Sequence, residues 1–350
     1  MAVPRPTSRT GQVVAFLRRH PIFTLALLTP GIPEYVLGSS NLSLLVVLPP
    51  LFVALLLVNV AMYTTGALLV REALLRWGKG LGSLIALGAA YAIVEEGVGT
   101  ATFFNPHTTA AGALGSYGHF LGVNWVFTLG IVGYHAFVSI GLPIALLGRI
   151  LPETRGRSLL PGRQALFALG VLGVDAGLVV LPLSERLTGF VTPAPLLLAC
   201  GVAIAGLVVL ARFLPRDAVV APTGRPTAPA WKFAALGAAF EPSVLLVESV
   251  PPALGLPAAA DLLLLGALGA AFAVVGLRWI GRGENDLAVI ALALGVVASL
   301  ATLGVLITWP VPTTLVAGGL AAFGLTRLYR RYERGELPRV PAAGPLASTP

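Results

Sequence analysis

Residues 44–70 read LLVVLPPLFVALLLVNVAMYTTGALLV and contain no charged residue. A transmembrane α-helix needs about 20 consecutive apolar residues to cross the hydrocarbon core of a bilayer. This stretch exceeds that length and ends at Arg71. It predicts a membrane-spanning helix, and the rest of the chain repeats the pattern.

The composition agrees with this interpretation. Of the 350 residues, 56% are hydrophobic and only 11% are charged. Soluble domains carry about 25% charged residues, so this chain has too few charges to cover a soluble fold of its size. Disordered chains combine low hydrophobicity with high charge, and that combination is absent. The expected fold class is an all-α, polytopic bundle of transmembrane helices.

Apolar stretches of suitable length occur ten times along the chain. The predicted spans are 21–37, 44–70, 82–104, 124–148, 164–182, 193–211, 233–250, 260–277, 287–309 and 312–327. Trp309, Pro310 and Val311 alone separate the last two, which predicts a tight helical hairpin. The first span is short and interrupted by prolines, so a signal peptide within residues 1–37 is the alternative there.

The basic residues predict the orientation of these spans. With ten spans, all of the 23 lysines and arginines except Arg186 fall on one side. Positive charge favours the cytoplasmic side, so we expect both termini in the cytoplasm and the chain in the plasma membrane. Despite a net charge of +8, this distribution is not a nucleic-acid-binding face. The expected partner is the lipid bilayer, with no nucleic acid.

The Pro/Ala-rich segment 213–231 predicts a cytoplasmic linker between an N-terminal membrane bundle, 1–212, and a C-terminal bundle, 232–350, with a basic tail. The single cysteine, Cys200, excludes an intramolecular disulfide and a cysteine metal cluster. Phosphate-loop, dinucleotide-binding and nucleophile-elbow motifs are absent in a usable context. We expect no cofactor and no metal.

Polar residues inside the predicted spans are the informative ones, because a charge at the bilayer centre costs a few kcal/mol. The candidate pathway residues are Glu95, Glu96, His135, Asp175, Glu241 and Glu248. No lysine or arginine lies deep in any predicted span. Like charges destabilise one another's ionised forms, so we expect shared protons or a bound cation in a polar cavity. For Asp175 alone, a protonated carboxyl hydrogen-bonded within the protein is the simpler interpretation.

Helix geometry gives further expectations. Neighbouring residues on an α-helix point about 100° apart, so Glu95 and Glu96 should not both face one narrow site. At least one of them should approach His135, because spans joined by a short loop are usually neighbours. Glu34 and Asp261 lie near outer span ends, where we expect them to be solvated.

Two prolines predict irregular backbone beside these groups. Pro242 directly follows Glu241, and Pro143 lies two turns after His135. Broken helices beside acids are typical of ion and substrate sites in membrane proteins, although an ordinary proline kink is the alternative. We expect Glu241 to be protonated at neutral pH, since burial and a nearby like charge both disfavour its ionised form.

The external loop, 105–123, is predicted to hold solvated histidines. His107 and His119 lack the spacing of a metal motif. Phe103, Phe104 and Trp125 flank this loop and are expected to form part of an interfacial aromatic belt.

Several short motifs resemble those of a group of bacterial and archaeal polytopic membrane proteins that has no established activity. They are GALLVRE at 66–72, RWGKG at 76–80, EEG at 95–97, FNP at 104–106, NW at 124–125 and His135. This resemblance covers residues 60–150 and implies common descent without implying a chemistry.

The order of a Glu-Glu pair followed by a histidine on a later helix also resembles the CAAX-protease and bacteriocin-processing family of intramembrane hydrolases. That resemblance implies catalytic roles for Glu95, Glu96 and His135. The EExxxR motif of the family would require arginine where Thr100 stands, and its FxxxH motif would require phenylalanine where Ile131 stands. No histidine follows His135, so the later HxxxN element is missing.

Three functions follow from these patterns. The leading hypothesis is a proton- or cation-coupled permease for a small solute, with Glu241 as the coupling carboxylate and an outward-facing acidic cavity. The alternative is an intramembrane hydrolase that acts on a lipid or a membrane-embedded peptide. The third is a non-catalytic assembly or signalling partner. An enzyme requires Glu and His within hydrogen-bond reach and access from the lipid, whereas a transporter requires a site between two halves.

Overall fold

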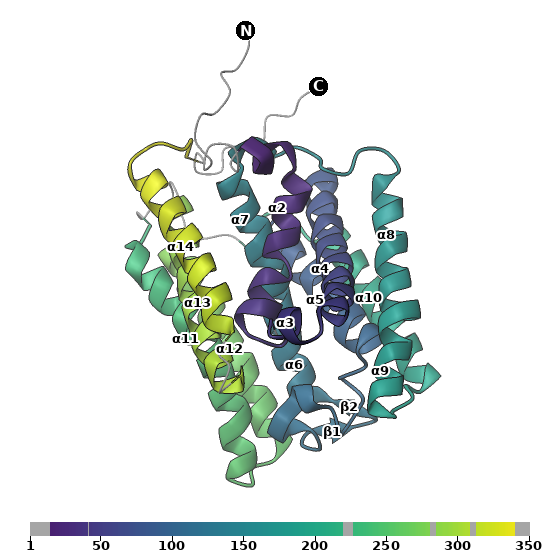
Figure 1. Cartoon of the computed structure of the whole chain (residues 1–350). Coiled ribbons are helices and arrows are strands. Elements are labelled where there is room, and N and C mark those ends of the chain that lie inside the picture. The colour runs from purple at the N-terminus through teal and green to yellow at the C-terminus, as the bar shows by residue number, and fades with distance from the viewer. Residues whose placement is uncertain (1–14, 41, 220–226, 281–284, 309–312, 340–350) are drawn as a thin grey trace.

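The computed structural model describes residues 15–40, 42–219, 227–280, 285–308 and 313–339, which form a bundle of helices (Figure 1). The all-α expectation is confirmed for this part of the chain, apart from one small antiparallel hairpin. In that hairpin β1 (His119–Phe120) pairs with β2 (Val123–Asn124).

The described α-helices follow one another along the chain, with a long connection, 100–124, before α6. They are α2 (Pro21–Leu28), α3 (Leu44–Val47), α4 (Pro49–Trp77), α5 (Leu81–Ala92), α6 (Trp125–Tyr134), α7 (Leu142–Ile150), α8 (Gln164–Val174), α9 (Leu181–Thr188), α10 (Ala194–Phe213), α11 (Ala230–Ala253), α12 (Ala258–Trp279), α13 (Asp286–Thr308) and α14 (Thr314–Glu333). Short 3₁₀ turns lie at η3 (Thr109–Leu114) and η5 (Pro152–Thr154).

Within the described residues, eight helical segments are long and apolar enough to cross a membrane. They are Pro49–Trp77, Leu81–Gly99, Trp125–Ile150, Gln164–Thr188, Ala194–Phe213, Ala230–Ala253, Ala258–Trp279 and Asp286–Leu306. The chain is therefore a multi-pass membrane protein by length and composition. The remaining predicted spans, 21–37 and 312–327, correspond to the shorter α2 region and to the more polar α14.

Three other predictions fall partly or wholly outside the described residues. The hairpin at Trp309, Pro310 and Val311 lies outside them, and so do residues 220–226 of the predicted linker and residues 1–14 of the possible signal peptide. The described start of the linker lies against the beginning of α5, since Lys79 Nζ donates to the carbonyl of Leu214 (2.7 Å).

Four π-helical segments interrupt the membrane helices at their polar positions. They are η1 (Gly31–Val36), η2 (Ile93–Gly99), η4 (His135–Gly141) and η6 (Asp175–Val180). Their wider turns carry i→i+5 hydrogen bonds, such as that from Thr100 N to Glu95 O (2.7 Å). Such turns are frequent at functional sites.

The proline predictions have different outcomes. Pro143 follows η4 and cannot donate to the Ser139 carbonyl, so the expected irregularity beside His135 is confirmed as a π turn. The expected break at Pro242 is wrong, because α11 continues through that residue to Ala253. Proline is tolerated inside membrane helices whose neighbours and side chains satisfy the freed groups.

Two close helix contacts position the polar centre. A Cβ on Gly66 would overlap the ring of Tyr91, which brings α4 against α5. A Cβ on Gly88 would lie 2.8 Å from the Ala136 Cα, which brings α5 against η4. The Gly88 contact brings the helix that leads to Glu95 close to the backbone next to His135.

A buried ion pair joins α4 to the connection before α8. Glu72 is 2% exposed and accepts hydrogen bonds from Leu159 N (2.7 Å) and Ser158 Oγ (2.6 Å). It also pairs with Arg71 at 3.1 Å, and Arg71 donates to the Thr154 carbonyl (2.6 Å). The segment that Arg71 contacts also lies near the start of α2 and the end of α14, since Glu153 pairs with Arg18 and Arg155 donates to the Tyr332 hydroxyl (2.8 Å). In Figure 1 the end of α14 lies opposite β1 and β2.

Candidate functional site

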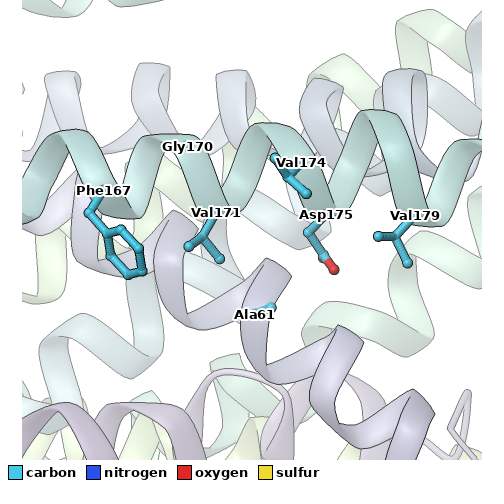
Figure 2. Close-up of a pocket in the computed structure, with 7 residues that line it drawn as sticks. All are labelled: Ala61, Phe167, Gly170, Val171, Val174, Asp175 and Val179. Atoms are coloured by element: carbon cyan, nitrogen blue, oxygen red, sulfur yellow. The ribbon is translucent and has the colours of Figure 1, made fainter.

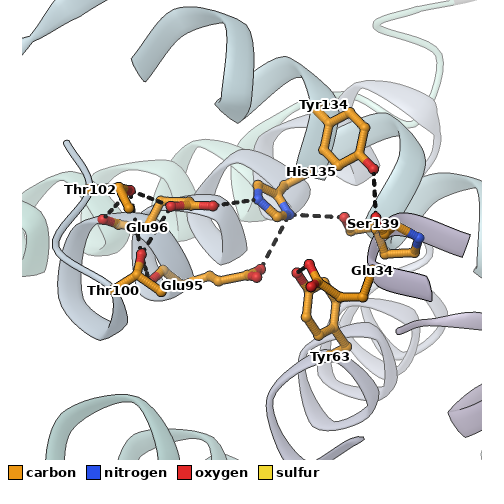
Figure 3. Close-up of polar contacts among 10 residues, drawn as sticks. Glu34, Tyr63, Glu95, Glu96, Thr100, Thr102, Tyr134, His135 and Ser139 are labelled. Atoms are coloured by element: carbon orange, nitrogen blue, oxygen red, sulfur yellow. Dashed lines mark hydrogen bonds and ion pairs between the residues drawn. The ribbon is translucent and has the colours of Figure 1, made fainter. Parts of the chain in front are cut away.

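His135 lies between two glutamates in the interior of the bundle (Figure 3). Its Nε2 is 3.0 Å from Glu96 Oε1, and its Nδ1 is 3.2 Å from Glu95 Oε2. Nδ1 also lies 2.9 Å from Ser139 Oγ. The exposed fractions are 2% for His135, 6% for Glu95 and 9% for Glu96. The predicted approach of the glutamate pair to His135 is confirmed.

The expectation that only one glutamate would face this site is wrong. Glu95 and Glu96 contact opposite nitrogens of one imidazole ring. The 100° separation applies to an α-helix, whereas both residues lie in the wider π turn η2. Their long side chains also reach around the ring, so two adjacent residues can flank it.

The two carboxylates have different surroundings. Glu96 Oε2 accepts hydrogen bonds from Thr102 Oγ1 and from Thr100 Oγ1 (2.9 Å). Although Glu95 Oε2 is within ion-pair distance of the imidazole, it accepts no hydrogen bond from the described residues. The hydroxyl of Tyr91, which is 3% exposed, likewise makes no hydrogen bond within the geometric limits among them, although it interacts electrostatically with Glu95. Glu96 is thus anchored, whereas Glu95 has an oxygen available.

Three tyrosines enclose the imidazole. The ring centroids of Tyr63, Tyr91 and Tyr134 lie 6.2, 6.2 and 5.5 Å from that of His135. The Tyr63 hydroxyl donates to Glu34 Oε1 (2.6 Å). These rings replace lipid and bulk water around the charged groups, which strengthens the electrostatic interactions among them.

The expected solvation of Glu34 is wrong. Besides the bond from Tyr63, its Oε2 accepts one from Ser40 Oγ (2.8 Å). The π turn η1 holds this carboxyl next to α4, and Tyr134 donates to the Pro33 carbonyl in the same turn (3.1 Å). Glu34 is therefore part of the hydrogen-bonded surroundings of the centre.

Glu241 approaches the centre from α11. It is close enough to His135 and Tyr134 to interact with both electrostatically, and its Oε2 has no partner among the described residues. Glu248 lies seven residues further along α11, on the same face of the helix. It packs so closely against Gly130 that a Cβ on this glycine would overlap the Oε1 of Glu248. Both groups thus lie on the side of α11 that faces α6.

Asp175 lies apart from these groups. It lines an apolar groove of about 410 Å³ with residues of α4 and α8, and its side chain points into that groove (Figure 2). The other residues lining the groove are Ala61, Phe167, Gly170, Val171, Val174 and Val179. The expected internal hydrogen bond is not found among the described residues for Asp175 Oδ2.

Three further expectations about the loop region need correction. Asp261 has no exposed surface, and neither of its carboxyl oxygens has a partner in the described part of the chain. His119 Nε2 is also buried without a described partner, whereas His107 is exposed as expected. Phe103 and Phe104 are 4% and 5% exposed, because the chain after η2 folds back beneath α6 instead of entering the interface.

Sequence reasoning missed the residues that complete the centre. They are Glu34, Tyr63, Tyr91, Thr100, Thr102, Tyr134 and Ser139. A local signal was available for Ser139, four residues after His135, and for Thr100, four residues after Glu96. The same spacing relates Tyr91 to Glu95, and Tyr134 directly precedes His135. No local pattern indicates Tyr63 or Glu34, since they come from other helices.

The centre also has the donors of a metal site, which the sequence spacing did not predict. Glu95, Glu96 and His135 each offer one ligand atom, and these atoms lie within 4.8 Å of one another. One imidazole and two carboxylates suit Zn²⁺ or Mn²⁺. The available Glu95 Oε2 is consistent with such a ligand.

The chemistry of this chain has to be inferred from the geometry of the centre. Comparison with family models, with curated proteins and with solved structures gives no match.

Proposed function

We propose that this protein is an intramembrane hydrolase. Its centre, formed by Glu95, Glu96 and His135, activates a water molecule that attacks an acyl bond of a lipid or a membrane-embedded peptide. The observation that carries the proposal is one buried imidazole held between two carboxylates with unlike surroundings. Two titratable groups kept in different environments are the usual basis for separate acid–base roles.

Glu95 is the proposed general base. Its available oxygen can accept a proton from a water molecule, whose oxygen then attacks the acyl carbon. The C–O bond forms as the acyl π electrons move to the acyl oxygen. When that tetrahedral species collapses, the bond to the leaving group breaks, and the proton held by Glu95 passes to the leaving group.

His135 is proposed to stabilise the negative charge that develops on the acyl oxygen. An imidazole that donates from both nitrogens carries a positive charge, and Glu96, itself anchored by two threonines, holds the ring in place. The Tyr91 hydroxyl is a further donor. Preorganised donors of this kind contribute a large part of the rate in acyl transfer.

Access from the bilayer supports a lipophilic substrate. The apolar groove at Asp175 lies between α4 and α8, and η6 packs against the η2 segment that carries both glutamates. A substrate that enters from the hydrocarbon region would reach this groove without crossing an aqueous phase.

The test uses isotope transfer, because this readout works for any substrate that is hydrolysed. The purified protein is incubated in H₂¹⁸O with membranes of its expression host, and products are analysed by mass spectrometry. We expect lipid or peptide acids that carry ¹⁸O with the wild type and are absent with Glu95→Gln. The control Glu153→Gln alters an exposed residue paired with Arg18 and should retain the products. Equal labelling by wild type and Glu95→Gln contradicts the proposal.

A proton-coupled permease is the second candidate, and the position of Glu241 favours it. This residue reaches the centre from α11, which belongs to the predicted C-terminal bundle, whereas Glu95 and His135 belong to the N-terminal one. A site between two halves is what alternating access requires. In proteoliposomes loaded with a pH-sensitive dye, solute-dependent acidification that Glu241→Gln abolishes would favour this candidate over hydrolysis.

A further inference from the structure

A second cavity lies at the end of the bundle that carries β1 and β2. It has a volume of about 510 Å³ and is lined by loop residues 116–120, by Trp125 and by the start of α12. His119 lines this cavity, and its Nε2 is buried without a partner among the described residues. We call this cavity the outer pocket, following the predicted orientation of the chain.

Asp261 lies directly beneath the outer pocket. Its helical neighbours Ala258 and Leu262 line the pocket, and its carboxyl interacts electrostatically with Tyr117, another lining residue. Both oxygens of this fully buried carboxyl lack described partners. Buried polar atoms in proteins are nearly always hydrogen-bonded, and ordered water supplies the bond where the protein does not.

Two further carboxyls continue from Asp261 toward the centre. Glu248 interacts electrostatically with Asp261 and with Glu241, and Glu241 in turn interacts with His135. Glu241 and Glu248 are seven residues apart on α11, so they share a face and are separated by about 10 Å along the axis. Since α11 packs against both α6 and α12, this face lies inside the bundle.

We propose that a hydrated path leads from the outer pocket past Asp261, Glu248 and Glu241 to His135. Two or three waters at hydrogen-bond spacings of about 2.8 Å would bridge the gap of about 10 Å between Glu248 and Glu241. The path gives partners to the unpaired oxygens of Asp261 and Glu241 and to the His119 nitrogen. Its purpose rests on the proposed function, because hydrolysis consumes water.

Every titratable side chain that faces the path can hydrogen-bond to water. From the loop, α6 and η4 these are Tyr117, His119, Tyr134 and His135, and from α11 and α12 they are Glu241, Glu248 and Asp261. None of them is a lysine or an arginine.

The test measures water access without any substrate. Cys200 is first replaced by alanine, and single cysteines are then introduced at Asp261, Glu248 and Glu241 in membrane vesicles of known sidedness. Matched controls at similar depth are Leu263 and Leu246, which are 75% and 63% exposed on the surface of the bundle that faces lipid. The probe is the impermeant cationic reagent MTSET, and labelling is followed by mass spectrometry.

We expect the path cysteines to react at least tenfold faster than their controls from the outer side, with rates that fall from 261 to 241. Rates equal to those of the controls would overturn the path. For any cysteine variant that does not fold, deuterium exchange in the wild type replaces it. In that measurement the carboxylic acid infrared bands should shift within seconds in D₂O, and bands unchanged after hours would also overturn the path.

The two proposals fail separately. Fast labelling together with absent ¹⁸O transfer would leave the hydrated path standing and remove the hydrolase. Slow labelling together with ¹⁸O transfer that depends on Glu95 would remove the hydrated path and leave the hydrolase standing.

Discussion

Replacing Glu72 by glutamine tests the buried ion pair at the end of α4. The substitution keeps the shape of the side chain and one acceptor for Leu159 N, but it leaves the 6% exposed Arg71 without its counter-ion. Breaking a buried pair costs about 3–5 kcal/mol. Because Arg71 retains its bond to the Thr154 carbonyl, we expect the lower end, about 3 kcal/mol.

The chain contains its own reporter for this measurement. Cys200 is its only cysteine and is 6% exposed on α10, so a fluorogenic thiol dye reacts with it on unfolding. At about 2 °C per kcal/mol for a large domain, Glu72→Gln should lower the midpoint in detergent by about 6 °C.

The exposed pair of Glu153 with Arg18 provides the matched control. These side chains are 43% and 50% exposed, and such pairs contribute less than about 1 kcal/mol. Glu153→Gln should therefore shift the midpoint by less than about 2 °C. Equal shifts for the two variants, or a Glu72→Gln shift below about 2 °C, would refute the conclusion that the Arg71–Glu72 ion pair stabilises the bundle.

Three further outcomes are expected. Gly88→Val should lower the unfolding midpoint by several degrees in the same dye assay, because the valine side chain would press α5 away from η4. Gly133→Ala should leave the midpoint unchanged, because a Cβ at Gly133 meets nothing within 4 Å. In a cysteine-free background, a cysteine at Ser116 should react with an impermeant thiol reagent on intact cells and one at Ser158 should not; labelling at Ser158 would contradict the predicted topology. Glu241→Gln should remove a protonated-carboxyl band from the infrared spectrum, and an unchanged spectrum would mean that Glu241 is ionised.

Hydropathy and charge were sufficient to predict the class of fold. Eight of the predicted spans fall on long apolar helices, since each span is decided by its own composition. The approach of Glu95 to His135 was also predictable, because one short loop joins their helices. Both properties depend on residues that are close together in the sequence.

The wider surroundings of the centre were not predictable in this way. Glu34 and Tyr63 meet across helices 29 residues apart in the chain, and neither has a local pattern that indicates it. The flanking of His135 by both glutamates depends on the π turn η2, whose backbone geometry hydropathy does not encode. The burial of Asp261 likewise follows from how α12 packs against α6 and α11.

The π turns also bear on how such a centre can arise and be lost. Each of η1, η2, η4 and η6 holds about one residue more per turn than an α-helix does. Removal of a single codon there would leave an apolar segment that still inserts into the bilayer, but every residue beyond it would rotate by about 100°. Insertion of the chain and assembly of its polar centre are therefore separable by mutation. A descendant that lacked one codon in η2 would be a well-folded membrane protein with Glu95 and Glu96 no longer on either side of His135.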